Sequence, residues 1–582
     1  MIRVLFPSGR SRVGIVFVAV AIVFAQSSVA QSSVAQSSVA QEAHSASGRR
    51  GMVASVNPIA TEAGLNALRL GGNAVDAAIA TALTLGVVDG HNSGLGGGCF
   101  VLIRTADGRI VAIDGREMAP AAATRDMFVR DGKVVPGLST TGPLAVGVPG
   151  ALAAYDKALA AHGRLELASL LEPAADIAEH GFKIDRVYAR KLKRVATSLA
   201  KFPASRAMLL RPDGEPYDEG EMLQLRDLAK TYRSIAQHGT DWFYRGEFAS
   251  IVAGWMQANG GLLTEEDFAN YTAKSRPPVR TRYRDVEVIG FPPPSSGGTH
   301  VAEILNILES FPIGSMLRED PAAATHTIAE AMKLAFADRA HWLGDSDFAK
   351  VPRGLVRKDY ARSLAARIKT DRAIDVPSHG LPPDWETDLY GKHTTHIAAA
   401  DDAGNWVAIT ATVNTTFGSK VVVPGTGLVL NNEMDDFSAL PGSPNAFGLV
   451  GAEANAVAPG KRPLSSMSPT IVLRDGEPVL TVGGAGGPKI ITSVLLAIVR
   501  SLDGKMEISE SIAAPRFHHQ WKPEKLFVER TTEESIVEHL RSLGHEVEFL
   551  TSAAVVQGIQ RLPDGTFIGC ADPRVPGKAS GY

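Results

Sequence analysis

The feature that most constrains the fold is a change of pattern at Thr394, where strand signals begin to dominate the chain. Short turn sequences rich in Asp and Gly separate apolar, β-prone segments, a pattern typical of antiparallel hairpins. Three such pairs stand out: 99–104 with 109–113, 394–400 with 406–413, and 470–473 with 479–482. The C-terminal third is therefore predicted to be built around antiparallel sheet.

Helical periodicity is concentrated elsewhere. It predicts helices over 60–70 and 75–88, the first stopped by Gly71-Gly72, and a mostly helical middle from 151 to 347. Within that middle, 326–343 is periodic, and 489–502 is a strongly apolar helix after the second late hairpin. Hairpins grouped apart from helices favour an α+β layered fold over a doubly wound one.

Composition excludes several classes of protein. The 582 residues include 59 Lys and Arg against 62 Asp and Glu, a net charge of −3, so the chain lacks the basic surplus of a dedicated nucleic-acid binder. Hydrophobic residues make up 45%, as expected of a globular protein and not of a disordered one. Only Cys99 and Cys570 occur, which excludes a disulfide framework and a cysteine-rich metal site.

The first residues have the pattern of an export signal. Arg3, Arg10 and Arg12 precede an apolar run over 13–25, which is shorter than a membrane-spanning helix. Three copies of QSSVA follow over 26–40, so signal peptidase could cut after Ala30, Ala35 or Ala40. We expect residues 1–40 to be removed and the mature protein to be periplasmic, without a membrane span; an uncleaved anchor is the alternative.

A glycine-rich segment, Gly483 to Gly487, lies between a predicted strand and the apolar helix. Pro488 and Ile490 break the pattern of a phosphate-binding loop, and the segment does not fit a dinucleotide fingerprint. One interpretation is a tight strand-to-helix connection. The other is an oxyanion hole, in which free backbone N–H groups stabilise developing negative charge. Both remain open on these residues alone.

Other kinds of site find little support. There is no H-E-x-x-H motif, and His518 and His519 are adjacent, so no metal site and no cofactor are expected. No G-x-S-x-G elbow of a serine hydrolase is found. The segment 292–298 (PPPSSGG) is interpreted as a structural loop before a helix that begins near His300.

Thr394 offers a different chemistry. By composition it is a strand residue like many others. If the peptide bond before it were cut, its hydroxyl would become a nucleophile and its own α-amine a base within reach. An α-amine has a pKa of ~7.7–8.0, which suits proton transfer near neutral pH.

Many ordered stretches resemble bacterial γ-glutamyltranspeptidases. In the C-terminal part these are TTHIAAADDAGNWVAITATVNTTFG, NNEMDDFS, KRPLSSMSPT, GGAGGPKIITSV and APRFHHQW. Upstream they are NPIATEAGLNALRLGGNAVDAAIA, GLGGGCFVLI, DGREMAP, AVGVPG, PPPSSGGTH and LAFADRAHWLGD. The resemblance runs from Val53 to Tyr582, essentially the whole mature chain.

The resemblance implies an N-terminal-nucleophile fold, a four-layer αββα sandwich in which helices flank two stacked antiparallel sheets. It also implies a precursor that cuts itself before Thr394 into a large subunit, 41–393, and a small subunit, 394–582. These would form one structural domain as a heterodimer.

The resemblance also assigns roles to individual residues. Thr394 would be the nucleophile and Thr412 the residue that positions it, while Gly486 and Gly487 would supply the oxyanion-hole donors. A γ-glutamyl group carries an α-carboxylate and an α-ammonium, and both charges need partners away from water. Arg116, Ser465 and Ser466 would bind the carboxylate, and Asn414, Glu433 and Asp436 would surround the ammonium.

The implied activity is that of a γ-glutamyltransferase and glutathione hydrolase. Thr394 would attack the γ-amide of glutathione or a related compound, and the γ-glutamyl ester would pass to water, an amino acid or a dipeptide. Two departures from the family pattern stand out. Cys99 replaces an expected glycine, and Phe447 stands where many relatives have a tyrosine on a lid over the pocket, so the lid would lack that hydroxyl.

Two alternatives remain. A sibling acylase, such as a cephalosporin or glutaryl acylase, would not need to hold an α-amino acid head, so the presence of Arg116, Asp436, Ser465 and Ser466 speaks against it. An inactive periplasmic protein that binds γ-glutamyl peptides is disfavoured because Thr394 and Thr412 are both present.

Overall fold

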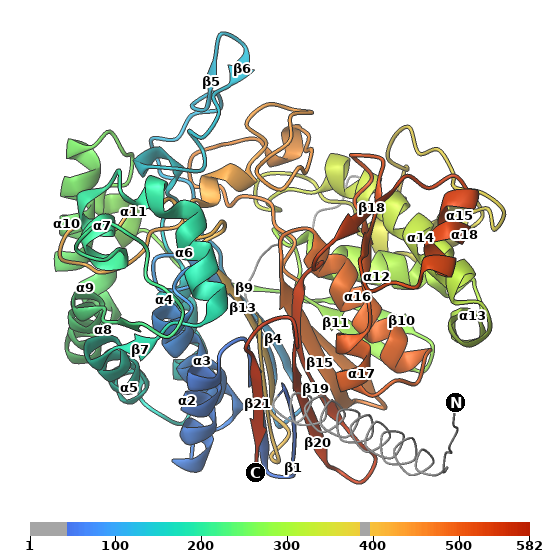
Figure 1. The fold of residues 1–582 in the computed structure, drawn as a ribbon, viewed down its shortest axis with the longest axis horizontal. Helices are drawn as coiled ribbons and strands as arrows, with labels where there is room; N and C mark the ends of the chain where they lie inside the picture. Colours follow the sequence, from blue (N-terminus) through green and yellow to red (C-terminus); the bar gives the residue numbers. More distant parts are fainter. Residues whose placement is uncertain (1–43, 384–395) are drawn as a thin grey trace, which may run out of the picture.

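Two antiparallel sheets lie face to face between two layers of helices (Figure 1). The computed structural model describes residues 44–383 and 396–582. This arrangement confirms the α+β prediction and the four-layer sandwich implied by the resemblance. Thr394 and the predicted leader fall outside the described residues.

The first sheet has the strand order β21-β2-β12-β13-β3-β4-β9. Its strands, in chain order, are β2 (Gly51–Ser55), β3 (Gly98–Arg104), β4 (Ile110–Gly115), β9 (Lys274–Arg276), β12 (His396–Asp401), β13 (Trp406–Thr412) and β21 (Lys578–Gly581). The second sheet has the order β1-β20-β19-β15-β14-β11-β10. Its strands are β1 (Ser45–Gly48), β10 (Val279–Tyr283), β11 (Val286–Gly290), β14 (Thr470–Arg474), β15 (Glu477–Ala485), β19 (Val555–Arg561) and β20 (Phe567–Ala571).

One helical layer covers the first sheet, at the left of Figure 1. It contains α2 (Pro58–Arg69), α3 (Ala74–Val88), α4 (Ala151–His162), α5 (Leu167–His180), α6 (Arg186–Leu199), α7 (Pro203–Leu209), α8 (Arg226–His238), α9 (Thr240–Tyr244), α10 (Glu247–Ala258) and α11 (Glu265–Ala269). The other layer covers the second sheet. It contains α12 (Ser296–Leu308), α13 (Ile313–Glu319), α14 (Pro321–Trp342), α15 (Lys358–Ala365), α16 (Lys489–Leu502), α17 (Ile508–Ala513) and α18 (Glu534–Ser542).

Short strands complete the structure. The pairs β5 (Val129–Arg130) with β6 (Lys133–Val134), and β7 (Phe182–Lys183) with β8 (Met222–Leu223), form small hairpins. A three-stranded sheet joins β16 (Phe517–His519), β17 (Leu526–Glu529) and β18 (Val547–Leu550). No helix in 44–383 or 396–582 is both long and apolar enough to cross a bilayer.

Side-chain alternation along β3 explains the layering. Successive residues of a strand point to opposite faces of the sheet. Val101 and Ile103 join the core beneath the helices of the first layer. Phe100 and Leu102 join the core between the two sheets. A strand buried on both faces needs apolar residues throughout, as β3 has.

The helical middle of the chain is more varied than predicted. Strands β10 and β11 form a hairpin there and extend the second sheet. α12 begins at Ser296, ahead of the predicted start, because the Ser295 hydroxyl accepts a hydrogen bond from the Gly297 N–H at 2.8 Å and caps the helix. α14 begins at Pro321, capped by Asp320, again ahead of the predicted start.

Loss of an aromatic pair between the sheets should destabilise the protein. The rings of Phe100 and Phe291 stack at 4.2 Å between centroids, both fully buried. Phe100→Ala should lower the free energy of unfolding by about 3 kcal/mol or more because it leaves a cavity in the core. Thermal unfolding should show a clearly lower midpoint for this variant than for Phe348→Ala, in which the replaced ring is half exposed. Equal midpoints would contradict the placement of Phe100 in the core.

Candidate functional site

A fully buried arginine, Arg116, occupies the turn that follows β4. Its guanidinium contacts three carboxylates: Nη1 bonds Glu433 and lies 3.3 Å from Glu117 Oε2, and Nη2 donates to Asp436 Oδ2 at 2.8 Å. Nε donates to the Pro463 carbonyl at 3.3 Å. We call Arg116, Glu117, Glu433 and Asp436 the arginine cluster. Glu433 and Asp436 belong to a single 3-10 turn, Glu433–Asp436.

The charges of the arginine cluster do not balance. The Arg116 guanidinium faces three buried carboxyls, and the buried Arg339 attracts one of them, Asp436. Burial, opposed by Arg116, raises the pKa of Glu117 to about 7, and burial also raises the pKa of Glu433 above its usual range. The cluster therefore has the capacity to accommodate a further cation.

A second set of charges fixes the backbone of Arg116. The Arg116 N–H donates to Asp114 Oδ1 at 2.9 Å. Asp114 is itself paired with Arg462 at 2.5 Å and with Arg276 at 3.0 Å. The Tyr271 hydroxyl donates to the Arg116 carbonyl at 2.6 Å. Both peptide groups of Arg116 are thus held by buried partners, and its side chain has a defined direction.

Ser465 and Ser466 continue from the Pro463 carbonyl that Arg116 contacts, and both are fully buried. The predicted loop 292–298 packs on them: the Ser296 N–H donates to the Ser465 carbonyl at 3.0 Å. Arg339 from α14 lies behind, with Nη2 3.4 Å from Ser466 Oγ and Nε donating to Ser296 Oγ at 3.0 Å. The stretch LAFADRAHWLGD contains Arg339, but the resemblance assigned this buried arginine no role. A charged residue within a largely apolar helix is the sequence feature that could have indicated one.

Gly486 and Gly487 lie where β15 gives way to α16, and both have positive φ, 144° and 63°. Phe447 covers them: a Cβ at Gly487 would lie 2.7 Å from Phe447 Cδ1, so only glycine fits beneath the ring. The Asn445 side chain reaches Asp436 Oδ1 at 3.3 Å. The loop carrying Phe447 therefore spans from the arginine cluster to the glycines.

Polar contacts other than a ring hydroxyl hold that loop. The Ala446 N–H donates to Asp435 Oδ2 at 3.0 Å, and the Phe447 N–H donates to Asn445 Oδ1 at 3.0 Å. The Gln520 amide donates to the Gly448 carbonyl at 3.3 Å. These bonds do not require a hydroxyl on residue 447.

Thr412 ends β13, opposite Gly98 of β3, and is buried. Its hydroxyl oxygen accepts a hydrogen bond from the Asn414 N–H at 2.6 Å. Asn414 has φ 74° and donates from Nδ2 to the Asn432 carbonyl at 3.0 Å. Thr412 and Asn414 are thus linked to each other and, through Asn432, to the turn that carries Glu433.

A cavity of about 1110 Å³ brings part of this set together. Asn414, Phe447, Gly486 and Gly487 line it. The arginine cluster, Ser465 and Ser466 form a separate buried group, joined to the cavity by the Asn445–Phe447 loop. The predicted site residues that the structure describes therefore fall into two neighbouring groups.

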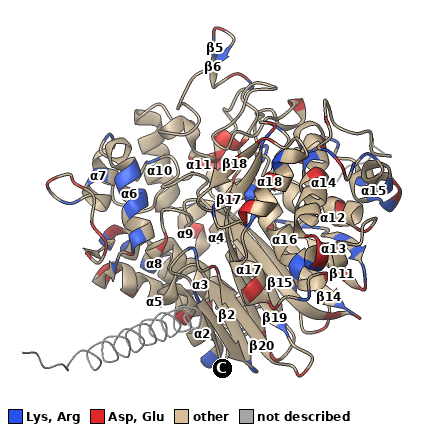
Figure 2. Cartoon of the chain, turned by 45° about the vertical axis from the view of Figure 1, so that its right-hand side comes forward, with Lys and Arg blue, Asp and Glu red and all other residues tan. Residues whose placement is uncertain are grey.

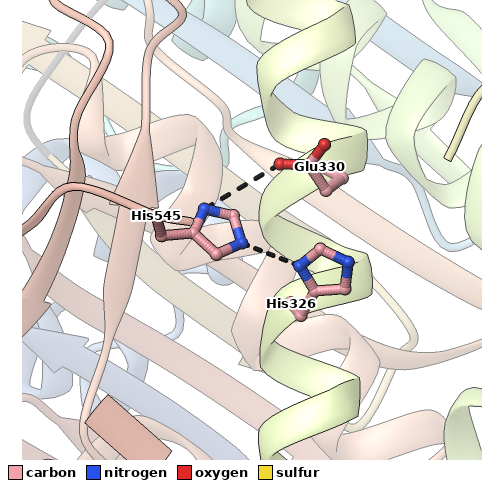
Figure 3. A group of neighbouring side chains, drawn as sticks. All are labelled: His326, Glu330 and His545. Atoms are coloured by element: carbon pink, nitrogen blue, oxygen red, sulfur yellow. Dashed lines mark hydrogen bonds and ion pairs between the residues drawn. The ribbon is translucent and has the colours of Figure 1, made fainter. Parts of the chain in front are cut away.

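A histidine pair elsewhere has potential metal-ligand geometry. His326, Glu330 and His545 converge from α14 and from the segment before β18 (Figure 3). His326 Nε2 donates to the Lys369 carbonyl at 2.6 Å, so Nδ1 accepts from His545 Nε2 at 2.7 Å. Lys333 Nζ lies 3.0 Å from Glu330 Oε1. A metal ion would have to displace these partners. Because 219 residues separate the two histidines, no local spacing motif in the sequence could have predicted that they lie together.

Comparison with known proteins gives a consistent result. Residues 60–582 match the family model described as gamma-glutamyltranspeptidase. A glutathione hydrolase proenzyme of Escherichia coli is 44% identical over 542 residues, which is 93% of each chain.

Solved structures agree with the sequence matches. The crystal structure of a cephalosporin acylase from Bacillus halodurans has a TM-score of 0.82 at 29% identity, over 92% of this chain and 97% of that one. One chain of the Helicobacter pylori gamma-glutamyltranspeptidase is 40% identical with a TM-score of 0.54. The match covers 92% of that chain but only 55% of this one.

The burial of the Glu117 carboxyl predicts a pH effect on stability. The pKa of Glu117 is about 4.5 in the unfolded chain and about 7 in the folded protein. The protonated carboxyl therefore contributes to the free energy of unfolding below pH 4.5, and this contribution declines as the pH rises to 7. Glu117→Gln carries no such titration. The thermal midpoint of this variant should therefore rise relative to wild type between pH 4.5 and 7. Glu219→Gln, at an exposed position, should show no such trend. A constant difference for Glu117→Gln would contradict the raised pKa.

Proposed function

Because the chain belongs to the gamma-glutamyltranspeptidase family, we propose that it is a precursor that cuts itself to become a γ-glutamyltransferase and glutathione hydrolase. The observation that carries the proposal is the arginine cluster, a buried guanidinium among carboxyls beside two buried serines. The substrates would be glutathione and other γ-glutamyl compounds.

The arginine cluster suits the head of a γ-glutamyl group. The α-carboxylate would bind Arg116 with the help of the Ser465 and Ser466 hydroxyls, since a forked guanidinium matches a carboxylate. The α-ammonium would lie beside Glu433 and Asp436, with Asn414 nearby. Arg116 would then exchange part of its contact with Glu433 and Asp436 for the substrate carboxylate. Both charges of the substrate would remain compensated away from water.

Thr394 would act at the other end of the substrate. Its hydroxyl attacks the γ-amide carbon and its α-amine takes the proton, while Thr412 positions the hydroxyl. The N–H groups of Gly486 and Gly487 stabilise the oxyanion. The C–N bond breaks with return of a proton to the leaving amine, which leaves a γ-glutamyl ester. Water, an amino acid or a dipeptide then attacks the ester and restores the threonine hydroxyl.

Scission before Thr394 would separate the chain into 41–393 and 394–582 without separating the fold. β12 and β13 lie between β2 and β3 in one sheet, and β14 and β15 lie between β11 and β19 in the other. Arg116 belongs to the first piece, while Glu433 and Asp436 belong to the second. The two pieces would remain a heterodimer held by shared sheets. Residues 1–40 would direct export to the periplasm and be removed.

An acylase remains the alternative enzyme, because a cephalosporin acylase shares the fold. An acylase substrate with no α-amino group would bring no ammonium to the carboxyls of Glu433 and Asp436. The direct comparison is hydrolysis of γ-glutamyl-p-nitroanilide against glutaryl-p-nitroanilide, which differ in the α-ammonium. Preference for the glutaryl compound would favour the acylase. Failure to hydrolyse either compound would favour a binding protein.

Substitution of the nucleophile should block both scission and turnover. Thr394→Ala should give one full-length band on denaturing electrophoresis and no hydrolysis, because no hydroxyl is present to attack. Thr394→Ser should still give two bands, since it retains a hydroxyl and, once cut, an α-amine. Two bands from the alanine variant would mean that another residue is the nucleophile for scission.

Arg116→Lys should separate binding from scission. Lysine retains the charge but not the fork, so KM for γ-glutamyl-p-nitroanilide should rise by about tenfold or more, roughly one lost charge-assisted hydrogen bond, while the chain still cuts. Arg125→Lys is the matched control, because Arg125 makes a forked pair with Glu453 at the surface. An unchanged KM for Arg116→Lys would remove this residue from the substrate pocket.

A further inference from the structure

The cavity beside Gly486 and Gly487 extends to a strongly cationic helix. Figure 2 shows Lys and Arg positions, in blue, gathered along α6. Arg186, Arg190 and Arg194 are spaced four apart, lie on one face and line the cavity together with Lys191. Lys420 lines it as well. We call these five residues the cationic wall.

Nearby carboxylates offset only part of the cationic wall: Asp89 and Asp185 attract Lys191, and Asp435 attracts Lys420. Within the described residues, none of its five members forms an ion pair. Arg194 donates to Thr416 Oγ1 at 2.7 Å, Lys191 to Asn92 Oδ1 at 2.5 Å and Lys420 to Thr415 Oγ1 at 3.1 Å, all of them uncharged acceptors. Like charges four apart on a helix cost stability. An anionic ligand could therefore neutralise the positive charges of Arg186, Arg190 and Arg194, which no ion pair within the described residues neutralises.

The two carboxylates that share the cavity, Asp89 and Asp185, both attract Lys191 but also bind groups outside the cationic wall. Asp185 caps α6 and accepts hydrogen bonds from the Val187 and Tyr188 N–H groups at 2.7 and 2.8 Å. Asp89 is buried and lies 3.1 Å from His91 Nε2, and it also accepts from the Asn92 amide at 3.0 Å. Arg574, which also lines the cavity, forms ion pairs with Glu529 at 2.5 Å and with Asp572 at 3.1 Å. The net field in the cavity is therefore positive.

From this arrangement we propose that the cationic wall binds the carboxylate of the acyl acceptor and of the leaving peptide, so that the enzyme prefers peptides and amino acids with a free carboxylate. The inference rests on the proposed function, since it places the acceptor in the cavity that the oxyanion glycines also line.

The chemistry of transfer fits such a site. The acceptor amine must reach the ester carbon beside Gly486 and Gly487, form a C–N bond, release the threonine oxygen and give up a proton. Its carboxylate lies a few bonds away, at the other end of a dipeptide, and would extend towards α6. An arginine pair such as Arg190 and Arg194 presents forked donors that suit a carboxylate. The field would also attract anionic acceptors from solution, an effect that salt screens.

The experiment measures acceptor preference in a double variant that combines Arg190→Gln with Arg194→Gln. With γ-glutamyl-p-nitroanilide as donor, transfer to glycylglycine is compared with transfer to glycylglycine amide, which lacks the carboxylate. The variant should lose about fivefold or more in kcat/KM for glycylglycine, the size of a weak ion pair, and keep its rate with the amide. Hydrolysis of the anilide, whose leaving group has no carboxylate, should persist and shows that the variant folds.

The matched control is Lys193→Gln/Lys201→Gln, which removes the same charge from exposed positions on and just after α6 that do not line the cavity. It should keep the wild-type preference for glycylglycine. An unchanged preference in the arginine variant, or no preference in wild type, would overturn the inference while anilide hydrolysis still supports the proposed function. Absence of anilide hydrolysis in wild type would overturn both.

Discussion

The structure around the site depends on the burial of one guanidinium. A charge removed from water must be paired and hydrogen-bonded, or the fold loses several kcal/mol. Arg116 meets this requirement with one neighbour in sequence, Glu117, and with distant partners. These are Glu433 and Asp436, more than three hundred residues later, and the Pro463 carbonyl. The loops that hold these partners are thereby fixed relative to the end of β4.

That requirement also links the two halves of the proposed precursor. Arg116 lies before Thr394 and two of its three carboxylate partners lie after it. The sheets repeat the pattern, since each contains hydrogen-bonded neighbouring strands from both halves. A chain built this way can lose one internal peptide bond and keep its structure. The proposed scission would therefore change the chemistry of Thr394 and leave the arginine cluster assembled.

Local sequence signals predicted the local structure well. The hairpin β14–β15, the helix α16 and the helix α3 were found because turn residues, capping residues and periodicity act over a few positions. The hairpin β10–β11 was missed because it is a short pair within a helical region. The burial of Arg116 could not be found from its neighbours Asp114 and Glu117, which suggest an exposed ion pair. Its partners Glu433 and Asp436 are distant in sequence, and only the family resemblance placed them nearby.

If scission turns Thr394 into a chain terminus with its own base, the smaller fragment must begin at that residue. N-terminal sequencing of the smaller fragment of the purified wild-type protein measures this. We predict a sequence that begins Thr-Thr-His-Ile-Ala, from Thr394 onward. A fully active protein that remains one unbroken chain, or a fragment that begins at another residue, would contradict the account.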